Sequence, residues 1–306
     1  MTQIEITFLG TTAAVPTKVR NHPAIHLRYQ SENEYCYLFD CGEGTQRQIL
    51  YSGLNFMRID EIFITHLHAD HFAGLFGLLE SMSLEGRKKP LRIFAPEAEK
   101  FVEALQSVGY SSKNFAVIPR NVAFEGNEIE RLVDAEEFTV YAIPVKHGIP
   151  AVAYAFVEKD RIKIDKAKAK KLGLPETGPL YRKIKAEGSD VFNGKKIMLD
   201  DISIVEKGKK VVYSGDTMPC SNIVKLASDA DLLIHDSTFF TDLEGMEGAR
   251  HSSLDEVMRI AKQAKAKGVI LTHISRRYQD IKELKEKIKG YENVKIAKDF
   301  MKIVLK

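Results

Sequence analysis

The segment Thr65-His66-Leu67-His68-Ala69-Asp70-His71 constrains this chain more than any other feature. It places three imidazoles and a carboxylate within six positions, directly after an apolar run. Side chains alternate along extended backbone, so a strand that ends in a tight turn would point His66 and His68 the same way. Asp70 and His71 would then lie past the bend and face a second point. Imidazole and carboxylate are ligands of Zn²⁺ and similar ions, so the segment predicts two adjacent metal sites. A surface turn that is His-rich by chance is a weak alternative in a chain with nine histidines.

The pattern His-x-His-x-Asp-His resembles the signature of the metallo-β-lactamase superfamily. Four further segments resemble the other motifs of that superfamily, in the same order along the chain: Leu38–Gly44 with Asp40, Val145–His147, Val212–Thr217 with Asp216, and Leu271–His273. Each is weak alone, because a single His or Asp after an apolar run is usually a strand end. The ordered set covers essentially the whole chain. It implies an α/β fold, the metallo-β-lactamase αββα sandwich, with metals at one edge of two packed sheets.

A narrower resemblance is to the ribonuclease Z family, endonucleases that remove 3′ trailers from precursor tRNA. Pro16–Asn21 fits the family's Pro-x-Lys-x-Arg-Asn loop. His235–Thr238 is similar to its His-Glu-Ala-Thr motif and His251–Ser253 to its His-Ser-Thr loop. Asp236 is one methylene shorter than the glutamate of the family motif, so its hydrogen-bonding reach differs.

The resemblance implies two Zn²⁺ ions per subunit, for which Mn²⁺ or Co²⁺ can substitute. The ligands of one ion would be His66, His68, His147 and Asp216, and those of the other would be Asp70, His71, His273 and Asp216. Asp70 would also orient or deprotonate the attacking water. His251 would protonate the leaving ribose 3′ oxygen, because His can supply a proton near neutral pH.

Three further residues are predicted to support these groups. Asp40 would hydrogen-bond a ligand imidazole; a capping role before Gly42 is the compatible alternative. His235 would support His251 or a metal ligand, with Asp236 fixing the tautomer of His235. The alternative for His235 is a satisfied core histidine at a strand end, and the sequence leaves both open.

RNA-binding residues are predicted in two segments. Lys18 and Arg20 would neutralise acceptor-stem phosphates, together with Asn21 of the same loop. Gly178 and Pro179 match a Gly-Pro pair in the tRNA-binding arm of the family. Arg276 and Arg277 extend the basic track by position alone. His22 and His26 flank the loop, and structural and phosphate-contacting roles stay open for both.

Positive charge is concentrated in residues 159–196. This window holds twelve Lys or Arg and five Asp or Glu, a net charge of +7, while the whole chain has +3 and the remainder therefore −4. Concentrated charge is typical of a nucleic-acid contact. Pro and Gly punctuate residues 172–181 too closely for one regular element. We interpret 158–196 as an inserted, flexible, protruding basic arm (exosite) that binds tRNA, against the alternative of an ordinary solvated insertion.

A chain of 306 residues can hold one large domain or two modest ones, and the resemblance implies a single metallo-β-lactamase domain over residues 1–306. The hydrophobic content of 44% supports a folded core, and no window resembles a transmembrane run of about 20 apolar residues. The first residues alternate like a strand and do not resemble a signal peptide. Three cysteines form no CxxC pair and fit a reducing cytosol. We therefore expect a cytoplasmic protein that binds neither membrane nor DNA. The resemblance further implies a homodimer with precursor tRNA as its partner.

Apolar periodicity predicts mixed strands and helices, which is typical of an α/β sandwich. Predicted strands are Ile4–Leu9, Ala24–Tyr29, Tyr35–Phe39, Glu61–Thr65, Leu91–Phe94, Glu137–Ile143, Val152–Val157, Lys210–Ser214, Asp231–His235, Gly268–Leu271 and Lys302–Leu305. Predicted helices are Thr45–Tyr51, Phe72–Ser83, Ala98–Val108, Ser221–Ala227, Ser253–Ala266 and Gln279–Lys289.

The resulting prediction is a zinc-dependent endoribonuclease. It would remove the 3′ trailer of precursor tRNA by two-metal phosphodiester hydrolysis and leave a 3′-hydroxyl on the tRNA. One alternative is a small-molecule phosphodiesterase or other hydrolase of the same fold, such as an arylsulfatase, lactonase or thioesterase, which would not need the basic arm. Another is an RNA-binding scaffold with a vestigial metal site, which the complete ligand set disfavours. The inserted window is too short for the extra domain of a β-CASP nuclease.

Overall fold

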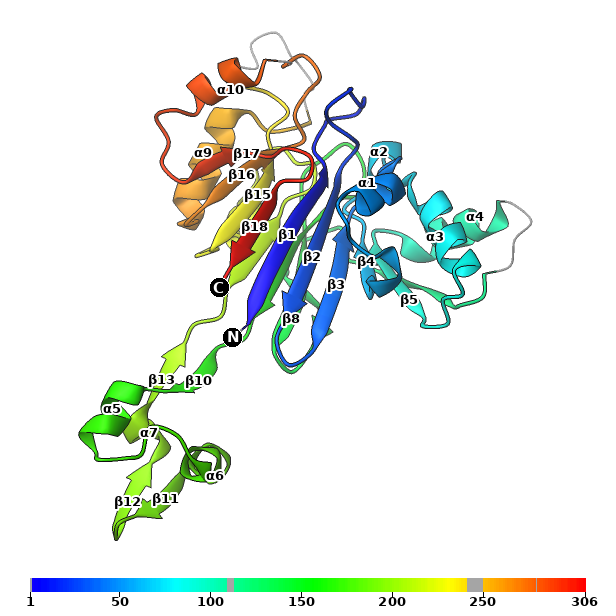
Figure 1. Cartoon of the computed structure of the whole chain (residues 1–306). Helices are drawn as coiled ribbons and strands as arrows, with labels where there is room; N and C mark the ends of the chain where they lie inside the picture. Colours follow the sequence, from blue (N-terminus) through cyan, green and yellow to red (C-terminus); the bar gives the residue numbers. More distant parts are fainter. Residues whose placement is uncertain (1, 109–112, 241–249, 279) are drawn as a thin grey trace. The chain divides into compact units, whose positions relative to one another are not determined.

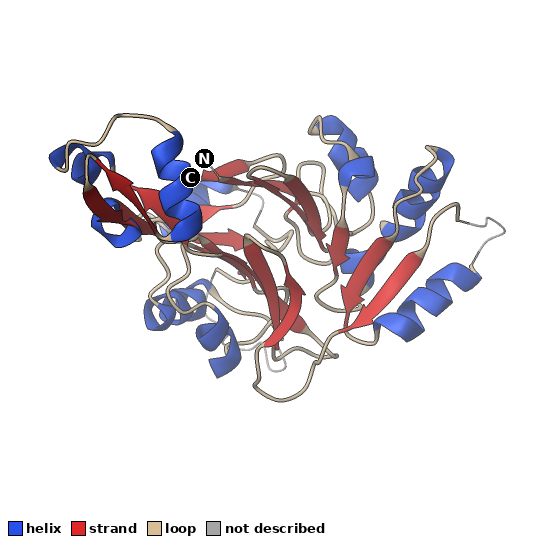
Figure 2. Ribbon diagram, turned by 90° about the horizontal axis from the view of Figure 1, so that it is seen from below, coloured by secondary structure: helices blue, strands red, loops and turns tan. Residues whose placement is uncertain are grey.

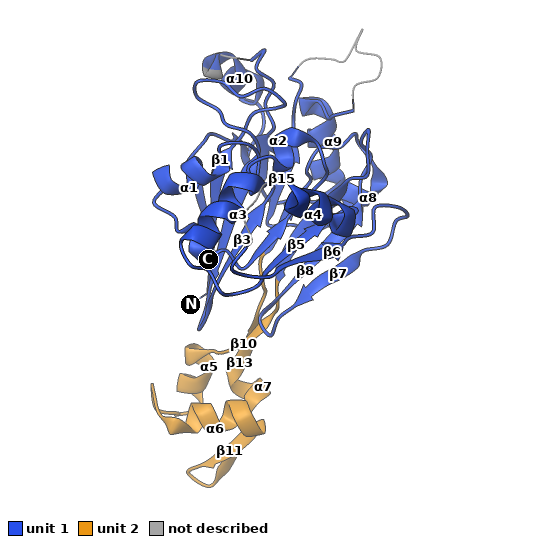
Figure 3. Cartoon of the chain, turned by 90° about the vertical axis from the view of Figure 1, so that its right-hand side faces the viewer, with its two compact units in different colours: residues 1–157, 210–306 blue, residues 158–209 orange. Residues whose placement is uncertain are grey.

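The structure is a computed structural model that describes residues 2–108, 113–240, 250–278 and 280–306. It divides into two compact units, which Figure 3 colours separately. Unit 1 comprises residues 1–157 and 210–306, and unit 2 comprises residues 158–209.

Unit 1 contains two sheets, each seven-stranded over the described residues (Figure 1). The first has the order β18 (Lys302–Leu305), β1 (Gln3–Gly10), β2 (Ala24–Gln30), β3 (Glu34–Phe39), β4 (Glu61–Phe63), β5 (Leu91–Ala95) and β6 (Val117–Asn121). The second has the order β17 (Val294–Ile296), β16 (Val269–Thr272), β15 (Leu232–Asp236), β14 (Lys210–Tyr213), β9 (Val152–Glu158), β8 (Phe138–Pro144) and β7 (Glu130–Asp134).

The two sheets lie face to face with helices on their outer faces (Figure 2). Alternation along β9 shows how the strands serve both layers: Tyr154 and Phe156 belong to the core between the sheets, whereas Ala153 and Ala155 belong to the core beneath the helices. The second sheet is covered by α8 (Ser221–Leu226), α9 (Leu254–Ala264) and α10 (Ile281–Lys287). The first is covered by α1 (Thr45–Tyr51), the 3-10 helix η1 (Phe56–Arg58), α2 (Ala69–Phe72), α3 (Leu75–Leu84) and α4 (Ala98–Ser107). The αββα sandwich is thereby confirmed.

Strand direction explains why the candidate site residues of both sheets can gather at one edge. Strands β3 to β6 are mutually parallel, as are β14 to β17. Parallel strands end at the same edge of a sheet, and ligands of such sheets bind beyond the carboxyl ends. The segments that follow β3, β4, β14 and β16 contain Asp40, His66, Asp216 and His273 respectively.

Each predicted strand is present, with ends that differ by at most two residues. The predicted helix Phe72–Ser83 is wrong at its start, since α2 ends at Phe72 and α3 begins at Leu75. The break has a tertiary cause, because the Gly74 N–H donates to the Cys41 carbonyl at 2.9 Å. The start of the predicted helix Gln279–Lys289 lies outside the described residues. Among the helices that the structure describes, none has the length and apolar character that a membrane crossing requires.

Unit 2 has its own small fold. It contains two antiparallel pairs, β10 (Arg161–Ile164) with β13 (Ser203–Glu206) and β11 (Ser189–Phe192) with β12 (Lys195–Met198). Between them lie α5 (Lys166–Lys171), α6 (Pro179–Glu187) and α7 (Leu199–Ile202). Their apolar side chains form a separate core of Ala169, Leu174, Ile184, Ile197 and Ile202. The unit runs past residue 196 to Lys209, and over its full length it has fourteen basic and nine acidic residues, a net charge of +5.

Candidate metal centre

Three imidazoles converge beyond the ends of β4 and β8. The Nδ1 atom of His68 lies 3.0 Å from Nε2 of His66 and 3.1 Å from Nε2 of His147. Asp216 completes the group, with Oδ2 3.6 Å from Nε2 of His66. One nitrogen or oxygen atom from each of these four residues lies within 4.8 Å of the others. The structure therefore brings together the four residues predicted as ligands of the first metal.

A second group lies on the other side of the same carboxylate. The Oδ2 atom of Asp216 is 3.3 Å from Nε2 of His71 and 3.3 Å from Nε2 of His273. The Oδ2 atom of Asp70 is 3.7 Å from the same nitrogen of His71 and 3.6 Å from that of His273. These are the four residues predicted for the second metal. Asp216 belongs to both groups, as the sequence predicted for a bridging carboxylate.

Outer hydrogen bonds aim the ring nitrogens into the two groups. Nδ1 of His147 lies 2.9 Å from the Arg250 carbonyl, and Nδ1 of His71 lies 2.8 Å from Oδ2 of Asp40. A carbonyl or carboxylate oxygen only accepts, so both Nδ1 atoms carry a proton, and Nε2 is the ring atom that each histidine turns toward its group. His273 is held similarly: Thr238 donates its hydroxyl to Asp236 at 2.7 Å and can accept from Nδ1 of His273 at 2.9 Å. Such outer contacts fix the tautomer of metal-ligating histidines.

The charge and burial of the residues in the two groups also suit the binding of divalent cations. Burial and the neighbouring His71 hold the pKa of His66 well below its usual value, and burial lowers the pKa of His68 and His147. These imidazoles are therefore neutral, which is the form that binds metal. In the second group, burial of the His71 ring lowers its pKa. The Asp216 and Asp40 carboxylates have the larger combined effect and raise that pKa well above its usual value. The Asp216 and Asp40 carboxylates thus favour a positive charge in the space between them.

Oδ1 of Asp216 is among the buried side-chain atoms that have no hydrogen-bond partner within the part of the chain that the structure describes. A buried carboxylate oxygen without a hydrogen bond is costly unless an ion or proton meets it. Together with the five imidazoles and two carboxylates, this fits a pair of divalent cations, and the nitrogen-rich donor set is typical of Zn²⁺ and neighbouring metals.

Gly215 explains how the chain delivers Asp216 to this point. Its φ is +57°, and a β-carbon at this position would lie 2.7 Å from the β-carbon of Thr65. Only glycine allows both the left-handed backbone and this close approach. The turn after β14 therefore depends on the Ser214-Gly215-Asp216 sequence.

His251 lies beside the metal-ligand groups and is paired with Asp236. Its Nδ1 is 2.9 Å from Oδ2 of Asp236 and 3.8 Å from Oδ2 of Asp216. Burial lowers the pKa of His251, but the Asp236 carboxylate outweighs it, so the pKa is raised above its usual value. Asp236 contacts the His235 ring through its backbone: Nδ1 of His235 lies 2.8 Å from the Asp236 carbonyl, which fixes the tautomer of His235 as predicted. The ring is fully buried, as in a core histidine.

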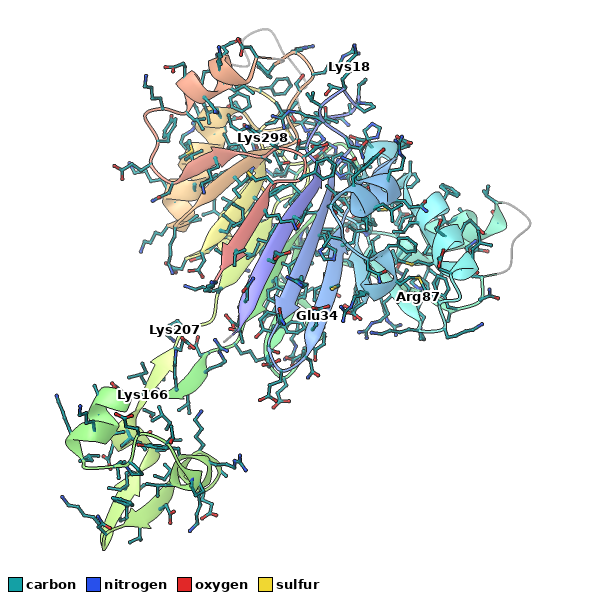
Figure 4. The ribbon with its side chains drawn as sticks, in the orientation of Figure 1. Lys18, Glu34, Arg87, Lys166, Lys207 and Lys298 are labelled. Carbon is teal, nitrogen blue, oxygen red and sulfur yellow. The ribbon has the colours of Figure 1, made fainter. Side chains whose placement is uncertain are left out.

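The predicted RNA-binding residues divide into exposed and buried ones. Lys18 is exposed at the end of its loop, where Figure 4 labels it. Arg20 does not have the predicted position: its side chain is 7% exposed, and Nη1 donates to the Thr11 hydroxyl at 2.6 Å and the Ala297 carbonyl at 2.7 Å. A guanidinium held this way cannot reach a phosphate without leaving its partners. Asn21 donates its side-chain amide to the Glu43 carbonyl at 2.9 Å.

In unit 2, Gly178 and Pro179 are exposed at the start of α6. Pro at the first helical position suits its fixed φ, so this pair also has a helix-starting role. Arg276 and Arg277 are exposed beyond His273.

Two site residues were not predicted. The Tyr213 hydroxyl donates to Oδ2 of Asp40 at 2.7 Å, and the Thr65 hydroxyl lies 3.0 Å from each oxygen of the same carboxylate. Neither position has a sequence signal beyond its place next to a motif. Asp40 has φ +56° and is fully buried, so these contacts fix the carboxylate that holds His71.

Comparison with known proteins agrees with this geometry. The family model described as a beta-lactamase superfamily domain matches residues 202–274, and the model described as anti-Pycsar protein Apyc1 matches residues 4–162. With the two-sheet fold and the paired His/Asp groups, these matches define a hydrolase of the metallo-β-lactamase superfamily.

Full-length relatives define the family within it. A ribonuclease Z of Archaeoglobus fulgidus is 42% identical, with 98% of this chain and 97% of that protein covered, and a ribonuclease Z of Methanococcus maripaludis is 39% identical, with 99% and 100% covered. The solved short form of human tRNase Z has a TM-score of 0.71 at 29% identity, with 98% of each chain covered. The chain belongs to the ribonuclease Z family and is a hydrolytic endoribonuclease.

Proposed function

We propose that this chain is a zinc-dependent endoribonuclease that cuts precursor tRNA at the start of the 3′ trailer and leaves a 3′-hydroxyl on the tRNA. The observation that carries the proposal is the pair of His/Asp groups that share Asp216. The family relatives are named ribonuclease Z, and the human structural neighbour is named tRNase Z. Their names support tRNA as the substrate here.

Two divalent ions fit this donor set. His66, His68, His147 and Asp216 would hold one, and Asp70, His71, His273 and Asp216 would hold the other. Bound ions would supply a water nucleophile of lowered pKa and neutralise charge on the phosphoryl oxygens. We propose Zn²⁺ as the physiological ion, with Mn²⁺ or Co²⁺ able to substitute.

Asp70 and His251 have complementary roles in the proposed hydrolysis. One oxygen of Asp70 faces the rings of His71 and His273, and the carboxylate orients the attacking water and accepts its proton. The water oxygen forms a bond to phosphorus as the bond between phosphorus and the ribose 3′ oxygen breaks. His251, whose pKa Asp236 raises, donates a proton to that oxygen. The tRNA keeps the 3′-hydroxyl and the trailer keeps the phosphate.

The exposed cations of unit 2 support the proposal that the substrate is RNA. Within the described residues seven of them form neither an ion pair nor a side-chain hydrogen bond: Lys166, Lys170, Lys171, Arg182, Lys185, Lys195 and Lys196. Figure 4 labels Lys166 on this unit. Exposed unpaired cations are free to neutralise phosphates. We propose that unit 2 is the tRNA-binding arm, inserted into one metallo-β-lactamase domain, and that Lys18 and Asn21 contact the acceptor stem.

We further propose a cytoplasmic homodimer. Cys36, Cys41 and Cys220 are free thiols, which fits a reducing compartment.

The proposal is tested by incubating the purified chain with a 3′-extended precursor tRNA and mapping the cut and both new ends. We expect one cut at the start of the trailer, a 3′-hydroxyl on the tRNA and a 5′-phosphate on the trailer. Intact precursor tRNA together with rapid hydrolysis of a small phosphodiester would favour the small-molecule alternative instead. Chelation should abolish the cut, and added Zn²⁺ should restore it.

A further inference from the structure

The loop between β1 and β2, residues 11–23, contacts the second ligand group at two points. The Ala14 N–H donates to Oδ2 of Asp70 at 3.0 Å. The Ile274 N–H donates to the Thr11 carbonyl at 2.9 Å, and the Ala13 N–H donates to the Ile274 carbonyl at 3.0 Å. Ile274 directly follows His273, whose φ is +57°. The β1–β2 loop therefore fixes the surroundings of both Asp70 and His273.

Ala14 is itself held in an unusual conformation. Its φ is +52°, and its carbonyl accepts from Nε2 of His22 at 3.1 Å. His22 can approach because Gly42 has no side chain: a β-carbon there would lie 2.4 Å from the β-carbon of His22 and 2.2 Å from the Asp70 carbonyl oxygen. The backbone of Ala14 is thus held at both of its polar groups, by Asp70 at the N–H and by His22 at the carbonyl. This contact gives His22 a structural role.

The two ends of the β1–β2 loop are joined by a network of hydrogen bonds among Thr11, Arg20 and Asp299, here called the relay. The Thr11 hydroxyl accepts from Nη1 of Arg20 at 2.6 Å and donates to Oδ1 of Asp299 at 2.7 Å. Asp299 accepts from the Asn21 N–H at 2.7 Å and from the Gln48 side chain at 3.0 Å. Thr11 is fully buried. Breaking such a relay leaves buried polar groups without partners, so it strongly favours one loop conformation.

We propose that Arg20, Thr11 and Asp299 are positioning residues for catalysis. They hold the β1–β2 loop so that the Ala14 N–H fixes the carboxylate of Asp70. The same loop exposes Lys18, so RNA contact and Asp70 orientation are built on one segment. Val19 beside it is 72% exposed and its side chain takes no part in the relay. The inference rests on the proposed function, because it takes Asp70 as the group that orients the attacking water.

This role differs in its kinetics from a direct phosphate contact by Arg20. Loss of a phosphate contact raises KM for RNA and leaves a substrate too small to reach the loop unaffected. Loss of the relay misplaces Asp70 and lowers kcat for every substrate, since small errors in position cost up to roughly 100-fold in rate. A small bis-aryl phosphodiester and precursor tRNA together separate the two roles.

The test compares Thr11→Val, which removes only the hydroxyl, with Thr11→Ser, which keeps it. Arg20→Met removes the other partner, and Val19→Ala is the exposed control on the same loop. We expect kcat in Thr11→Val and Arg20→Met to fall roughly 10- to 100-fold on both substrates. Thr11→Ser and Val19→Ala should remain near the parent. Hydrogen–deuterium exchange of the peptide covering residues 11–21 should rise in the first two variants only, at unchanged metal content.

Parental kcat on the aryl diester in Thr11→Val and Arg20→Met would overturn the inference, whatever happens to KM for RNA. Equal losses in Thr11→Ser and Thr11→Val would overturn it too, because the hydroxyl would then not be responsible. If Thr11→Val does not fold, Asp299→Asn takes its place with the same expectation. A parent that hydrolyses the aryl diester but not precursor tRNA would refute the proposed function, while the aryl diester and exchange measurements would still decide the inference.

Discussion

Nδ1 of His251 lies 2.9 Å from Oδ2 of Asp236, which is fully buried. The carboxylate also accepts hydrogen bonds from the Thr217 and Thr238 N–H groups, at 3.3 Å and 2.9 Å. Asp236 therefore stays ionised and holds His251 in a fixed orientation with Nδ1 protonated. In the proposed general-acid role, His251 would therefore donate the proton on Nε2. A buried pair of this kind couples the His235–Thr238 motif to the His251–Ser253 motif.

Replacing His251 by Ala should slow precursor tRNA cleavage by about 10²- to 10⁴-fold, because the 3′ oxygen loses its proton donor. The loss should be smaller for an activated aryl phosphodiester, whose leaving group needs no proton. Elemental analysis should show unchanged metal content. Equal losses on the two substrates would contradict the general-acid role.

Elemental analysis of the purified parent should give two divalent ions per chain, since two ligand groups share Asp216. His147→Ala removes a ligand of the first group only and should reduce the content toward one ion, whereas Asp216→Ala should reduce it at both sites. Either change should abolish cleavage. Full activity in a preparation with one ion per chain would contradict the two-metal layout.

The grouping of the candidate metal ligands could be predicted from sequence because each one follows a strand that ends at the same edge. Asp216 and His273 follow the apolar strands β14 and β16, whose ends are aligned by parallel pairing through β15. His66 follows the apolar strand β4 of the other sheet. The position of Arg20 could not be predicted this way. A loop arginine gives no sign of whether it faces solvent or a buried carbonyl of a segment 277 positions away. The partner of the Asp236 carboxylate was missed for the same reason, since the adjacent His235 points into the core.

The strands of the central layers were predictable because their apolar residues are continuous or alternate. The edge strands β6 and β7 were not, since they are only half-buried and carry charged residues. Unit 2 was predicted by its charge but not by its elements. Its core consists of five small or aliphatic residues scattered among lysines, too sparse to give a period.

Gly215→Ala should destabilise the fold and weaken metal binding. Alanine at φ +57° costs about 1–2 kcal/mol in the left-handed region, and its β-carbon would also overlap Thr65. Gly53→Ala is the matched control, because Gly53 has φ +72° and a β-carbon there would meet no atom within 4 Å. Urea unfolding should show a larger loss of unfolding free energy for Gly215→Ala. Equal losses would show that the contact with Thr65 adds nothing.

His26 should make stability fall in mild acid. Burial, aided by Arg28, lowers its pKa to about 4, and Nδ1 has no partner among the described residues. In the unfolded chain the imidazole titrates near 6.5, so the unfolded state takes up the proton first as pH falls. The free energy of unfolding is therefore unaffected above this range and falls by up to roughly 3 kcal/mol between pH 6.5 and 4.

The measurement is urea unfolding of the parent and His26→Gln at pH 7 and pH 4.5. Titration of other groups is common to both proteins, so the difference between them isolates His26. The variant should lose less stability than the parent on acidification. The same loss in both proteins would contradict the buried, neutral state of His26.

The affinity for precursor tRNA should fall steeply as the salt concentration rises, because unit 2 contributes phosphate contacts. If Lys166, Lys170 and Lys171 of α5 each neutralise a phosphate, their joint replacement by Ala should reduce the slope of log affinity against log salt by roughly 3, because each contact releases condensed counterions. Filter binding over a range of salt concentrations gives this slope. Replacing residues 159–208 by a short Gly-Ser loop should nearly eliminate precursor tRNA processing.

The matched control removes three lysines of the same unit that are already paired: Lys163 with Glu206 at 3.2 Å, Lys183 with Asp190 at 2.9 Å, and Lys207 with Asp160 at 2.5 Å. It changes the net charge by the same amount as the α5 variant but removes no free cation. We therefore expect a smaller change of slope and of KM. Equal effects of the two triple variants would show that affinity follows the net charge of the unit. A parental slope in the α5 variant would show that this helix does not contact the RNA.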